Sequence, residues 1–382
     1  MIEQITIKNF KSFRDVPLKL GSLNIFIGAN ASGKSNFFDA LRVLQGIGYG
    51  FTLSEILDGK PKSATSEVWE GIRGGHTQVP FAYEDANIPT SFQVTGRLPN
   101  GVCSDFEFTI AFLASGGLLR KERLSVSGEI IYEDETGEWP SLQRDQPWLT
   151  VIVRETDERR PEEAERVAHI FADMQRMDPS PTLLRAYSQA FKVKRMGERG
   201  ENFAALVRMI CDDPGTKEAY LSWLRELRPR DVNDIGIKEG AIGEPMLMMK
   251  ERGHEWPAPA LSDGTLRFAA IAAAFFQPDM PSILTIEEIE NGIHASRLRL
   301  LVELMRSQTA AGKTQVMVTT HSPVVLAWLK PEEYATTFCC KRDEETGESR
   351  IVPLSEIPRF QEVVSKQPIG DLFAEGWLEE AL

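Results

Sequence analysis

The amino-acid sequence predicts an α/β fold with a mixed β-sheet and a helical insert. The apolar run at residues 23–27 leads into a glycine-rich turn, and residues 35–44 follow with apolar side chains at helical spacing. Two further apolar runs of the buried-strand type, at residues 283–286 and 315–320, flank a helical pattern at residues 297–308. Strands that alternate with helices in this way are typical of an α/β protein.

The other elements of the first half are predicted from alternation and from turn residues. Residues 5–10 alternate like a strand, and residues 12–16 continue this pattern past a bend. Residues 49–80 are expected to be irregular, because glycine and proline interrupt them repeatedly. From about residue 90 the chain is strand-like and turn-rich, which predicts a small antiparallel sheet with strands at 91–95, 106–110, 130–132 and 149–153.

A change of composition at Pro161 marks a helix-rich insert that runs to about Arg228. Prolines punctuate this stretch, so we expect several short helices, and no heptad pattern is long enough to predict a coiled-coil arm. Pro229 and the polar cluster at residues 231–234 close the insert.

The C-terminal part is predicted to contain an apolar helix at residues 268–276 and a hairpin at residues 338–353 that turns at Thr346-Gly347. The acidic cluster at residues 343–345 is interpreted as a charged turn of this hairpin. The predicted domains are an N-terminal lobe, a helical insert and a C-terminal lobe, at residues 1–153, 154–235 and 236–382.

Composition limits the class of protein. The 382 residues are 42% hydrophobic and 26% charged, which is ordinary for a globular protein. No run approaches the roughly 18 apolar residues that a membrane span needs, and no secretory signal precedes the first strand pattern. The four cysteines show no metal-ligand spacing and are expected to be reduced thiols. We therefore expect a cytoplasmic protein without membrane contact.

The net charge is −13 and the isoelectric point is near 5.1, which argues against indiscriminate nucleic-acid binding. Arginines do gather in one region, but acidic residues are mixed with them, which is typical of a solvated helical surface. A local basic groove remains compatible with this region, whose arginines are Arg195, Arg199, Arg208, Arg225, Arg228 and Arg230.

Residues 28–35, Gly-Ala-Asn-Ala-Ser-Gly-Lys-Ser, form a phosphate-binding loop between a predicted strand and a predicted helix. Gly28 and Gly33 let the backbone turn so that its N–H groups face phosphate oxygens, and the helix adds the positive end of its dipole. Lys34 is predicted to reach the β- and γ-phosphates, and Ser35 to offer its hydroxyl to Mg²⁺. The loop therefore predicts a nucleotide site.

Glu287 and Glu288 follow the apolar strand at residues 283–286, where a carboxylate can reach a bound metal while the strand stays buried. Glu287 is predicted to hold Mg²⁺ through a water, and Glu288 to orient or deprotonate the attacking water. His321 follows the second apolar strand and is predicted to contact the γ-phosphate or the attacking water.

Ser262 and Gly264 lie in the stretch Leu-Ser-Asp-Gly-Thr-Leu-Arg at residues 261–267. A serine hydroxyl and exposed backbone N–H groups at a helix start are good phosphate donors. Because the loop at residues 28–35 already surrounds one side of the nucleotide, we expect Ser262 and Gly264 to bind the γ-phosphate of ATP held by a second copy of the chain.

These motifs, in this order, resemble those of the ABC-type ATPase heads of the RecF/SMC/OLD group, in particular the stand-alone AAA-family ATPases of bacteria and archaea. The matching segments span nearly the whole chain. They are the opening strand (7–13), Walker A (28–36), the signature motif (261–267), Walker B (283–288), the D-loop region (290–294) and the switch histidine (320–322).

The resemblance implies a P-loop NTPase fold, an ABC-ATPase head of two lobes, with ATP sandwiched between two heads and released on hydrolysis. It implies that Ser35, Glu287 and Gln78 serve the metal, Gln78 lying about where the family places its Q-loop. Residues implied in ATP binding are Lys11, Gly28, Asn30, Ser32, Gly33, Lys34, Ser35, Asn36, Ser262 and Gly264.

Three departures from the family pattern stand out. The Q-loop is not obvious, and Gln78 falls only about where the family would place it. Glu287 replaces the aspartate usual at the metal position, and its extra methylene could slow hydrolysis. Ile289 replaces the proline that often follows the acidic pair. The insert lacks the long arms of true SMC proteins, and we expect no Toprim nuclease after the switch histidine of the kind that OLD-type proteins carry.

Together these features predict a Mg²⁺-dependent ATP hydrolase that acts as an ATP-driven dimerisation switch. The resemblance implies a second copy, or a higher homo-oligomer, and a separate effector such as a nuclease as partners. DNA is a further candidate partner, in anti-phage defence or DNA maintenance. The alternatives are a scaffold that binds ATP with negligible turnover and the nucleotide-binding subunit of a membrane transporter.

Overall fold

The computed structural model describes residues 1–60, 69–81, 88–98, 104–114, 118–134, 145–154, 161–227 and 232–382. These residues form two compact units. The first unit comprises Met1–Met174, Tyr334–Gln361 and Gly376–Leu382, and the second comprises Gln175–Glu333 and Glu362–Glu375. Pro61, Cys103 and the insert-closing residues 228–231 lie outside the described residues.

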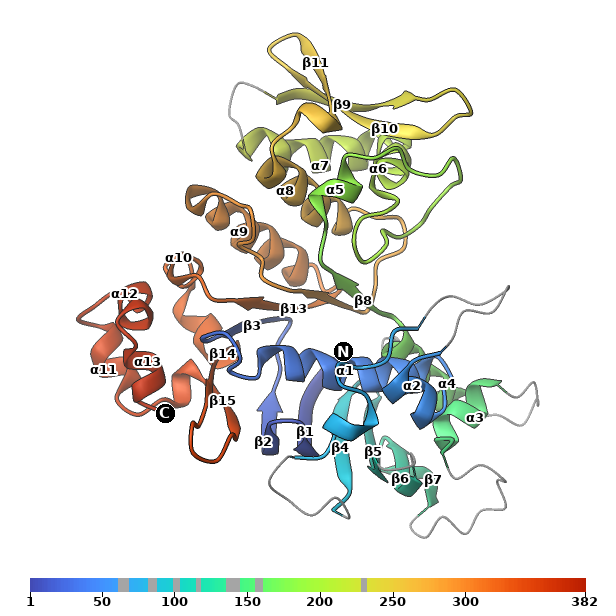
Figure 1. Cartoon of the computed structure of the whole chain (residues 1–382), viewed down its shortest axis with the longest axis vertical. Coiled ribbons are helices and arrows are strands. Elements are labelled where there is room, and N and C mark those ends of the chain that lie inside the picture. The colour runs from blue at the N-terminus through green and yellow to red at the C-terminus, as the bar shows by residue number, and fades with distance from the viewer. Residues whose placement is uncertain are drawn as a thin grey trace. The chain divides into compact units, whose positions relative to one another are not determined.

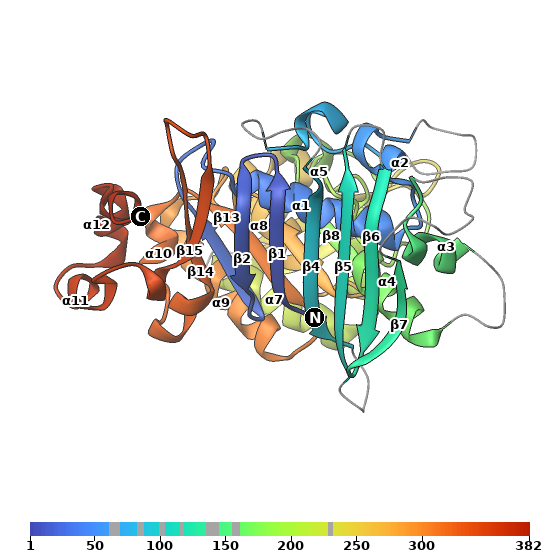
Figure 2. The same ribbon diagram turned by 90° about the horizontal axis from the view of Figure 1, so that it is seen from below.

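An antiparallel sheet in the order β2-β1-β4-β5-β6-β7 dominates the first unit, and Figure 2 shows its strands side by side. Side chains alternate between buried and exposed along β4, as expected for a sheet with one face on a core. The strands predicted near residues 5–16, 91–110 and 130–132 are confirmed. Their bounds are β1 (Ile2–Phe10), β2 (Phe13–Lys19), β4 (Thr90–Arg97), β5 (Asp105–Leu113), β6 (Leu118–Val126) and β7 (Glu129–Asp134).

A second group of strands in the first unit leads to the glycine-rich turn. The strand β3 (Leu23–Ile27) pairs in parallel with β14 (Thr337–Arg342), and β14 pairs antiparallel with β15 (Ser349–Pro353). The predicted strand at residues 23–27 is therefore confirmed as β3. The hairpin predicted at residues 338–353 is confirmed as β14 and β15. The rings of Phe26 and Phe338 stack with their centroids 4.9 Å apart, which fixes β3 against β14.

Helices complete the first unit (Figure 1). The predicted helix after the glycine-rich turn is confirmed as α1 and packs against α4. The helices are α1 (Lys34–Gly48), α2 (Leu53–Asp58), α3 (Trp148–Arg154), α4 (Glu162–Ala172) and α13 (Trp377–Glu380), with short 3-10 helices at His76–Gln78 and Leu354–Glu356.

Two predictions for the first unit are wrong. The run at residues 149–153 forms the helix α3 instead of a strand, because the buried carboxylate of Glu122 accepts hydrogen bonds from the Trp148 and Leu149 N–H groups and so caps the helix start. Residues 49–80 are not irregular throughout, because Thr52 and Glu55 form a capping box that starts α2.

The second unit contains the strands β12 (Ile283–Ile286) and β13 (Gln315–Thr320), which pair in parallel and have the bounds predicted from the sequence. The strand β8 (Met174–Met177) lies beside β12, inside the stretch that was predicted to be helical. The predicted apolar helix is confirmed as α8 (Asp263–Ala274), and the helix between the apolar strands as α9 (Ala295–Ala310).

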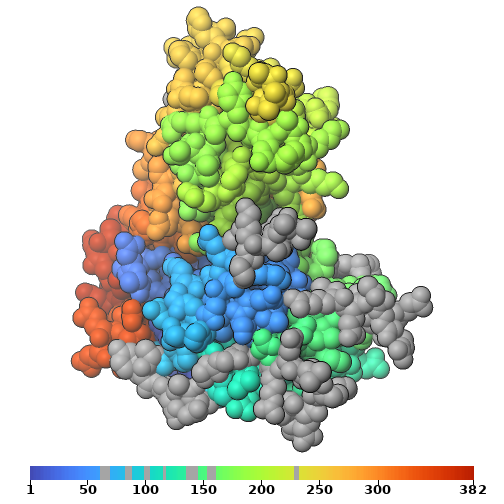
Figure 3. All heavy atoms as spheres, turned by 45° about the vertical axis from the view of Figure 1, so that its right-hand side comes forward, coloured from blue at the N-terminus to red at the C-terminus, as the bar shows by residue number. Residues whose placement is uncertain are grey.

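The rest of the second unit is a group of helices with a small antiparallel sheet of the order β11-β10-β9. In Figure 3 their green and yellow atoms form one continuous mass, in agreement with the contacts of α6 with β9 and β10. The elements are α5 (Pro181–Leu184), α6 (Phe203–Asp212), α7 (Pro214–Leu227), β9 (Val232–Glu239), β10 (Pro245–Glu251), β11 (His254–Pro257), α10 (Pro323–Leu326) and α12 (Ile369–Ala374).

Two short elements contain residues of both units, because a unit boundary falls inside each of them. They are a 3-10 helix at Pro331–Thr336 and α11 (Phe360–Val364). Another 3-10 helix, Ala258–Ala260, directly precedes the segment that leads to α8. Across the described part of the chain, none of the helices has the length and apolar character needed to cross a membrane.

Candidate active site

The loop between β3 and α1 depends on two glycines. Gly28 and Gly33 adopt φ angles of 149° and 109°. A Cβ atom on Gly28 would lie 2.2 Å from the carbonyl oxygen of Cys340, and one on Gly33 would lie 2.6 Å from the Ser349 hydroxyl oxygen. Both positions therefore exclude a side chain, because conformation and space forbid it together. Ala31 also adopts a left-handed conformation, with a φ of 64°, which costs about 1–2 kcal/mol for a residue other than glycine.

Lys34 is the buried cation of this loop, with 7% of its surface exposed. Its ammonium donates hydrogen bonds to the carbonyl oxygens of Gly28 and Ala29 at 2.6 and 2.8 Å, and lies 3.5 Å from the Ser32 hydroxyl. The lysine thus ties the start of the loop to its end. A buried ammonium beside the N-terminus of a 15-residue helix favours an anion at the loop.

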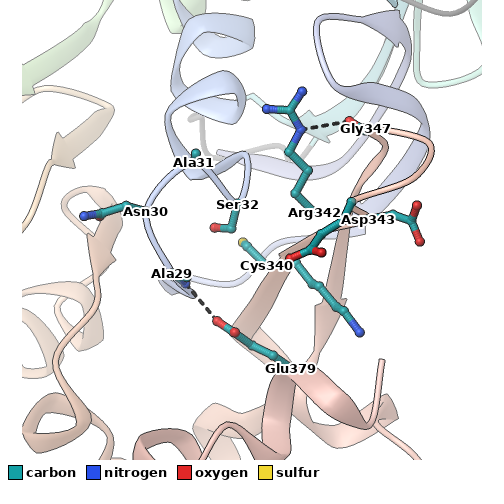
Figure 4. Close-up of a pocket in the computed structure, with 11 residues that line it drawn as sticks. Ala29, Asn30, Ala31, Ser32, Cys340, Arg342, Asp343, Gly347 and Glu379 are labelled. Carbon is teal, nitrogen blue, oxygen red and sulfur yellow. Dashed lines mark hydrogen bonds between the residues drawn. The ribbon is translucent and has the colours of Figure 1, made fainter.

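A pocket of about 570 Å³ borders the loop on the side of β14 (Figure 4). Ala29, Asn30, Ala31 and Ser32 form one wall, and residues of the β14–β15 hairpin and α13 form the other. The carboxylate of Glu379 accepts a hydrogen bond from the Ala29 N–H at 2.8 Å, so α13 anchors the loop (Figure 4). The volume is in the range of small-molecule sites.

A second pocket of the first unit, of about 410 Å³, gathers Lys11, Ser12, Asn36, Arg73 and Gln78. The Asn36 amide donates to the Ser12 hydroxyl at 2.7 Å, which connects α1 to the turn between β1 and β2. This pocket also shares Arg342 and Gly347 with the pocket beside Ala29, so both pockets border the same hairpin.

Lys11 is held within the second pocket by an acidic partner that the sequence did not indicate. Its ammonium pairs with the Asp39 carboxylate and donates to the Arg73 carbonyl at 2.8 Å. The Arg73 guanidinium also binds Asp39, at 2.8 Å. Burial lowers the pKa of Lys11, and the Asp39 carboxylate opposes this shift. Asp39 thus positions two cations at one pocket.

In the second unit, Glu287 directly follows the fully buried strand β12. One of its carboxylate oxygens lies 2.9 Å from the guanidinium of Arg176 on β8, and Arg176 also pairs with Glu198 at 3.2 Å. The predicted metal carboxylate is therefore fixed by a neighbouring arginine, which sequence reasoning missed.

Glu288 adopts a left-handed backbone conformation with a φ of 48°. Its N–H donates to the hydroxyl of Thr319 on β13 at 2.9 Å, and the Ile289 N–H donates to the Thr319 carbonyl at 3.2 Å. The Asn291 amide donates to the Glu288 carboxylate at 2.6 Å. A strained backbone over-determined by its surroundings is characteristic of functional sites.

His321 directly follows β13 and lies next to the loop after β12, which carries Glu288 and Glu290. Its backbone N–H donates to the Glu290 carboxylate at 2.7 Å, and its ring nitrogen Nε2 lies 3.4 Å from the same oxygen. The structure therefore brings Glu288 and His321, which are 33 positions apart in the sequence (321 − 288), to the same end of the paired strands β12 and β13.

Ser262 is the N-cap of α8, where its hydroxyl accepts from the Thr265 N–H and bonds the Thr265 hydroxyl at 2.8 Å. The serine is exposed. Gly264 packs closely on the loop that follows β12, because a Cβ atom there would lie 2.4 Å from the Gly292 carbonyl oxygen. The stretch at residues 261–267 and the loop at residues 290–294 are thus in direct contact within the second unit.

The structure groups the predicted site residues by unit. The first unit brings together Lys11, Asn36 and Gln78 at one pocket and Asn30, Ser32 and Lys34 at the loop. The second unit brings Glu287, Glu288 and His321 to one edge of its strands. The roles of these residues remain predictions. Residues that sequence reasoning missed are Asp39, Arg73, Arg176, Glu290, Asn291 and Thr319. Asp39 lies in the predicted helix at residues 35–44 and Thr319 in the predicted strand at residues 315–320, but neither pattern indicated their side-chain contacts.

Comparison with known proteins agrees with this geometry. Residues 23–327 match the family model described as "AAA domain, putative AbiEii toxin, Type IV TA system", so the chain belongs to this family. A curated relative from Helicobacter pylori, named ATP/GTP phosphatase, is 24% identical in an alignment that covers 90% of this chain and 94% of that protein.

Solved structures show the same fold. One is the SmcHead bound to the C-winged helix domain of ScpA, with a TM-score of 0.55, 14% identity, and coverage of 92% of this chain and 97% of that chain. Another is the Smc head domain with an extended coiled coil bound to the C-terminal domain of ScpA, derived from Pyrococcus furiosus, with a TM-score of 0.50, 14% identity, and coverage of 96% and 99%. The chain is therefore a member of this AAA domain family, and its fold is that of the SMC head domains.

Proposed function

We propose that the protein hydrolyses ATP to ADP and phosphate in a Mg²⁺-dependent reaction and that this reaction controls its dimerisation. The observation that carries the proposal is the strained, clamped conformation of Glu288 at the end of a buried strand, beside His321. A carboxylate held in this way is preorganised to act on one defined proton.

In the proposed reaction the loop of the first unit binds the phosphates, through its N–H groups and Lys34. Glu288 accepts a proton from a water whose oxygen attacks the γ-phosphorus, and the bond from that phosphorus to the β–γ bridging oxygen breaks. ADP and phosphate are the products. His321 contacts the γ-phosphate or the attacking water and so distinguishes ATP from ADP.

Ser35 and Glu287 are the residues that we propose for a magnesium ion, because both offer the hard oxygen ligands that this ion prefers. Bound Mg²⁺ would neutralise charge on the phosphate oxygens. The Arg176 guanidinium pairs with one Glu287 carboxylate oxygen, so the proposed contact of Glu287 with the metal is made through water and competes with this ion pair. Gln78 is the third residue proposed to serve the metal.

We further propose that Ser262 and Gly264 bind the γ-phosphate of ATP held by a second copy. The exposed Ser262 hydroxyl at the N-terminus of the 12-residue helix α8 supports this role, since a helix start attracts anions. ATP would then join two copies, and hydrolysis would release them. Higher homo-oligomers built from this dimer are part of the same proposal.

The proposed setting is the cytoplasm, in anti-phage defence or DNA maintenance, with a separate effector such as a nuclease and with DNA as a further partner. Support comes from the family description, which names a toxin and a type IV toxin–antitoxin system. Recovery of a nuclease or toxin by affinity purification under native conditions would strengthen this role, and its repeated absence would argue against it.

The test compares phosphate release by wild type, Glu288→Gln and Lys34→Ala at saturating Mg-ATP, with mass measured by light scattering. We expect Glu288→Gln to lose at least about 100-fold in kcat and to accumulate an ATP-bound dimer. Lys34→Ala should lose ATP binding and remain a monomer. Unchanged turnover in Glu288→Gln would refute the assigned base.

A scaffold that binds ATP with negligible turnover is the second candidate, favoured by one observation. The Arg176 guanidinium occupies one side of the Glu287 carboxylate, which weakens its ability to support a metal. Wild-type turnover indistinguishable from Lys34→Ala, together with a constant larger assembly with and without ATP, would select the scaffold.

A further inference from the structure

We infer that Glu290 is a positioning residue for His321. One oxygen of its carboxylate accepts the hydrogen bond from the His321 backbone N–H at 2.7 Å and lies 3.4 Å from the ring nitrogen Nε2. A single oxygen therefore fixes the main chain of His321 and faces its ring. The inference deepens the proposed function and rests on it, because it assigns the residue through which His321 is held.

Burial distinguishes Glu290 from an ordinary loop glutamate. Its side chain is 12% exposed, whereas that of His321 is 37% exposed. The second carboxylate oxygen of Glu290 and the ring nitrogen Nδ1 of His321 are buried without a hydrogen-bond partner among the described residues. Such groups cost about 1–3 kcal/mol each, so stability alone does not favour this arrangement.

The loop that carries Glu290 also carries Glu288. The Thr319 hydroxyl holds the Glu288 N–H, and two residues further along each segment Glu290 holds the His321 N–H. Together with the Ile289 N–H bond to the Thr319 carbonyl, these contacts join the loop after β12 to the end of β13 at both the proposed base and His321. Movement of His321 in response to the γ-phosphate would be transmitted to the Glu288 loop through Glu290.

The experiment measures kcat and KM for ATP in Glu290→Ala, Glu290→Gln, His321→Ala and the double variant Glu290→Ala/His321→Ala. We expect Glu290→Ala to lower kcat by about 10- to 100-fold, because misplacement of a catalytic group costs that much, with KM changed less than about twofold. Glu290→Gln should recover part of the loss, since its amide oxygen can still accept from the His321 N–H.

The double variant decides whether Glu290 acts through His321. We expect it to be no slower than His321→Ala alone. A further loss of the same factor in the double variant, or wild-type kcat in Glu290→Ala, would overturn the inference. Glu226→Ala, an exposed glutamate on α7, is the matched control and should retain wild-type kcat. Thermal unfolding of each variant separates these effects from loss of fold.

A readout without turnover keeps this inference distinct from the proposed function. The chain has five histidines, so an imidazole NMR spectrum of labelled protein can be assigned by substitution. In Glu290→Gln we expect the His321 signals to move while those of His76, His169, His254 and His294 stay in place. An unmoved His321 would overturn the inference even if ATP turnover were absent. Absent turnover with moved signals would refute only the proposed function.

Discussion

Replacement of Thr319 by valine tests whether the strained conformation of Glu288 matters for catalysis. Valine has nearly the shape of threonine but lacks the hydroxyl that accepts the Glu288 N–H at 2.9 Å. Thr319 is 2% exposed, so the methyl group that replaces the hydroxyl remains in a buried position. The backbone bond from Ile289 to the Thr319 carbonyl does not depend on the side chain.

The expected loss of activity follows from two opposing free energies, the cost of the Glu288 backbone conformation and the hydrogen bond that stabilises it. The left-handed conformation of Glu288 costs about 1–2 kcal/mol, and a hydrogen bond contributes about 1 kcal/mol net, or more where its loss leaves a partly buried group unpaired. Removing the hydroxyl should therefore shift the equilibrium away from the native Glu288 conformation by about 1–2 kcal/mol. This corresponds to roughly a 5- to 30-fold lower ratio of the native to the alternative conformation, and we expect kcat to fall by up to that factor.

The assay is phosphate release at saturating Mg-ATP, with ATP affinity measured separately by a fluorescent analogue. Affinity should remain near that of wild type, because the phosphate-binding loop belongs to the first unit. Thr319→Ser keeps the hydroxyl and should retain kcat within about twofold. The reasoning is refuted if Thr319→Val keeps wild-type kcat, or if Thr319→Ser loses as much as Thr319→Val.

Three further predictions concern other parts of the molecule. Gly28→Ala should lower the free energy of unfolding by at least about 2 kcal/mol and weaken ATP binding, as measured by urea unfolding and analogue titration, because its Cβ would meet a backbone oxygen at 2.2 Å. Arg176→Ala should lower the Mg²⁺ concentration for half-maximal turnover by about fivefold, since it releases the Glu287 carboxylate from its cation; no shift in a Mg²⁺ titration would contradict this. Burial raises the pKa of Glu122 from 4.5 to about 7 in the folded state. The folded protein therefore binds more protons than the unfolded chain between these pH values. Stability that is present below pH 4.5 is lost as the pH rises through 7, by up to about 3 kcal/mol. In Glu122→Gln, the free energy of unfolding by urea should no longer fall between pH 5 and pH 8. If wild type instead gains stability relative to the variant over this window, the N–H and hydroxyl donors around Glu122 outweigh its burial.

Local patterns in the sequence were sufficient for the elements next to the site. The strands at residues 283–286 and 315–320 have the predicted bounds, because each is a short apolar run that ends at polar residues. The phosphate-binding loop was predictable for a similar reason. Its chemistry lies in the backbone, which glycine at positions 28 and 33 permits and no other residue does.

The helix α3 shows where local patterns fail. Its β-branched residues Thr150, Val151, Ile152 and Val153 favour a strand by propensity. The structure makes them helical because the carboxylate of Glu122, on β6, satisfies the N–H groups of the first turn. No local pattern indicates that partner. The helix α2 is a different case, since Thr52 followed by Glu55 is a local sequence signal for a helix start.

The contacts around Glu288 and His321 were predictable in place but not in detail. Parallel neighbouring strands end at the same edge of a sheet, so the residues after β12 and at the end of β13 must lie close together once that pairing is known. Which atoms meet there depends on the left-handed turn at Glu288, a conformation that glutamate does not favour. That turn carries Glu290 to the N–H of His321 and directs the N–H of Glu288 to Thr319. Because the turn is stabilised by the contacts that it creates, neither can be derived from the sequence of one segment alone.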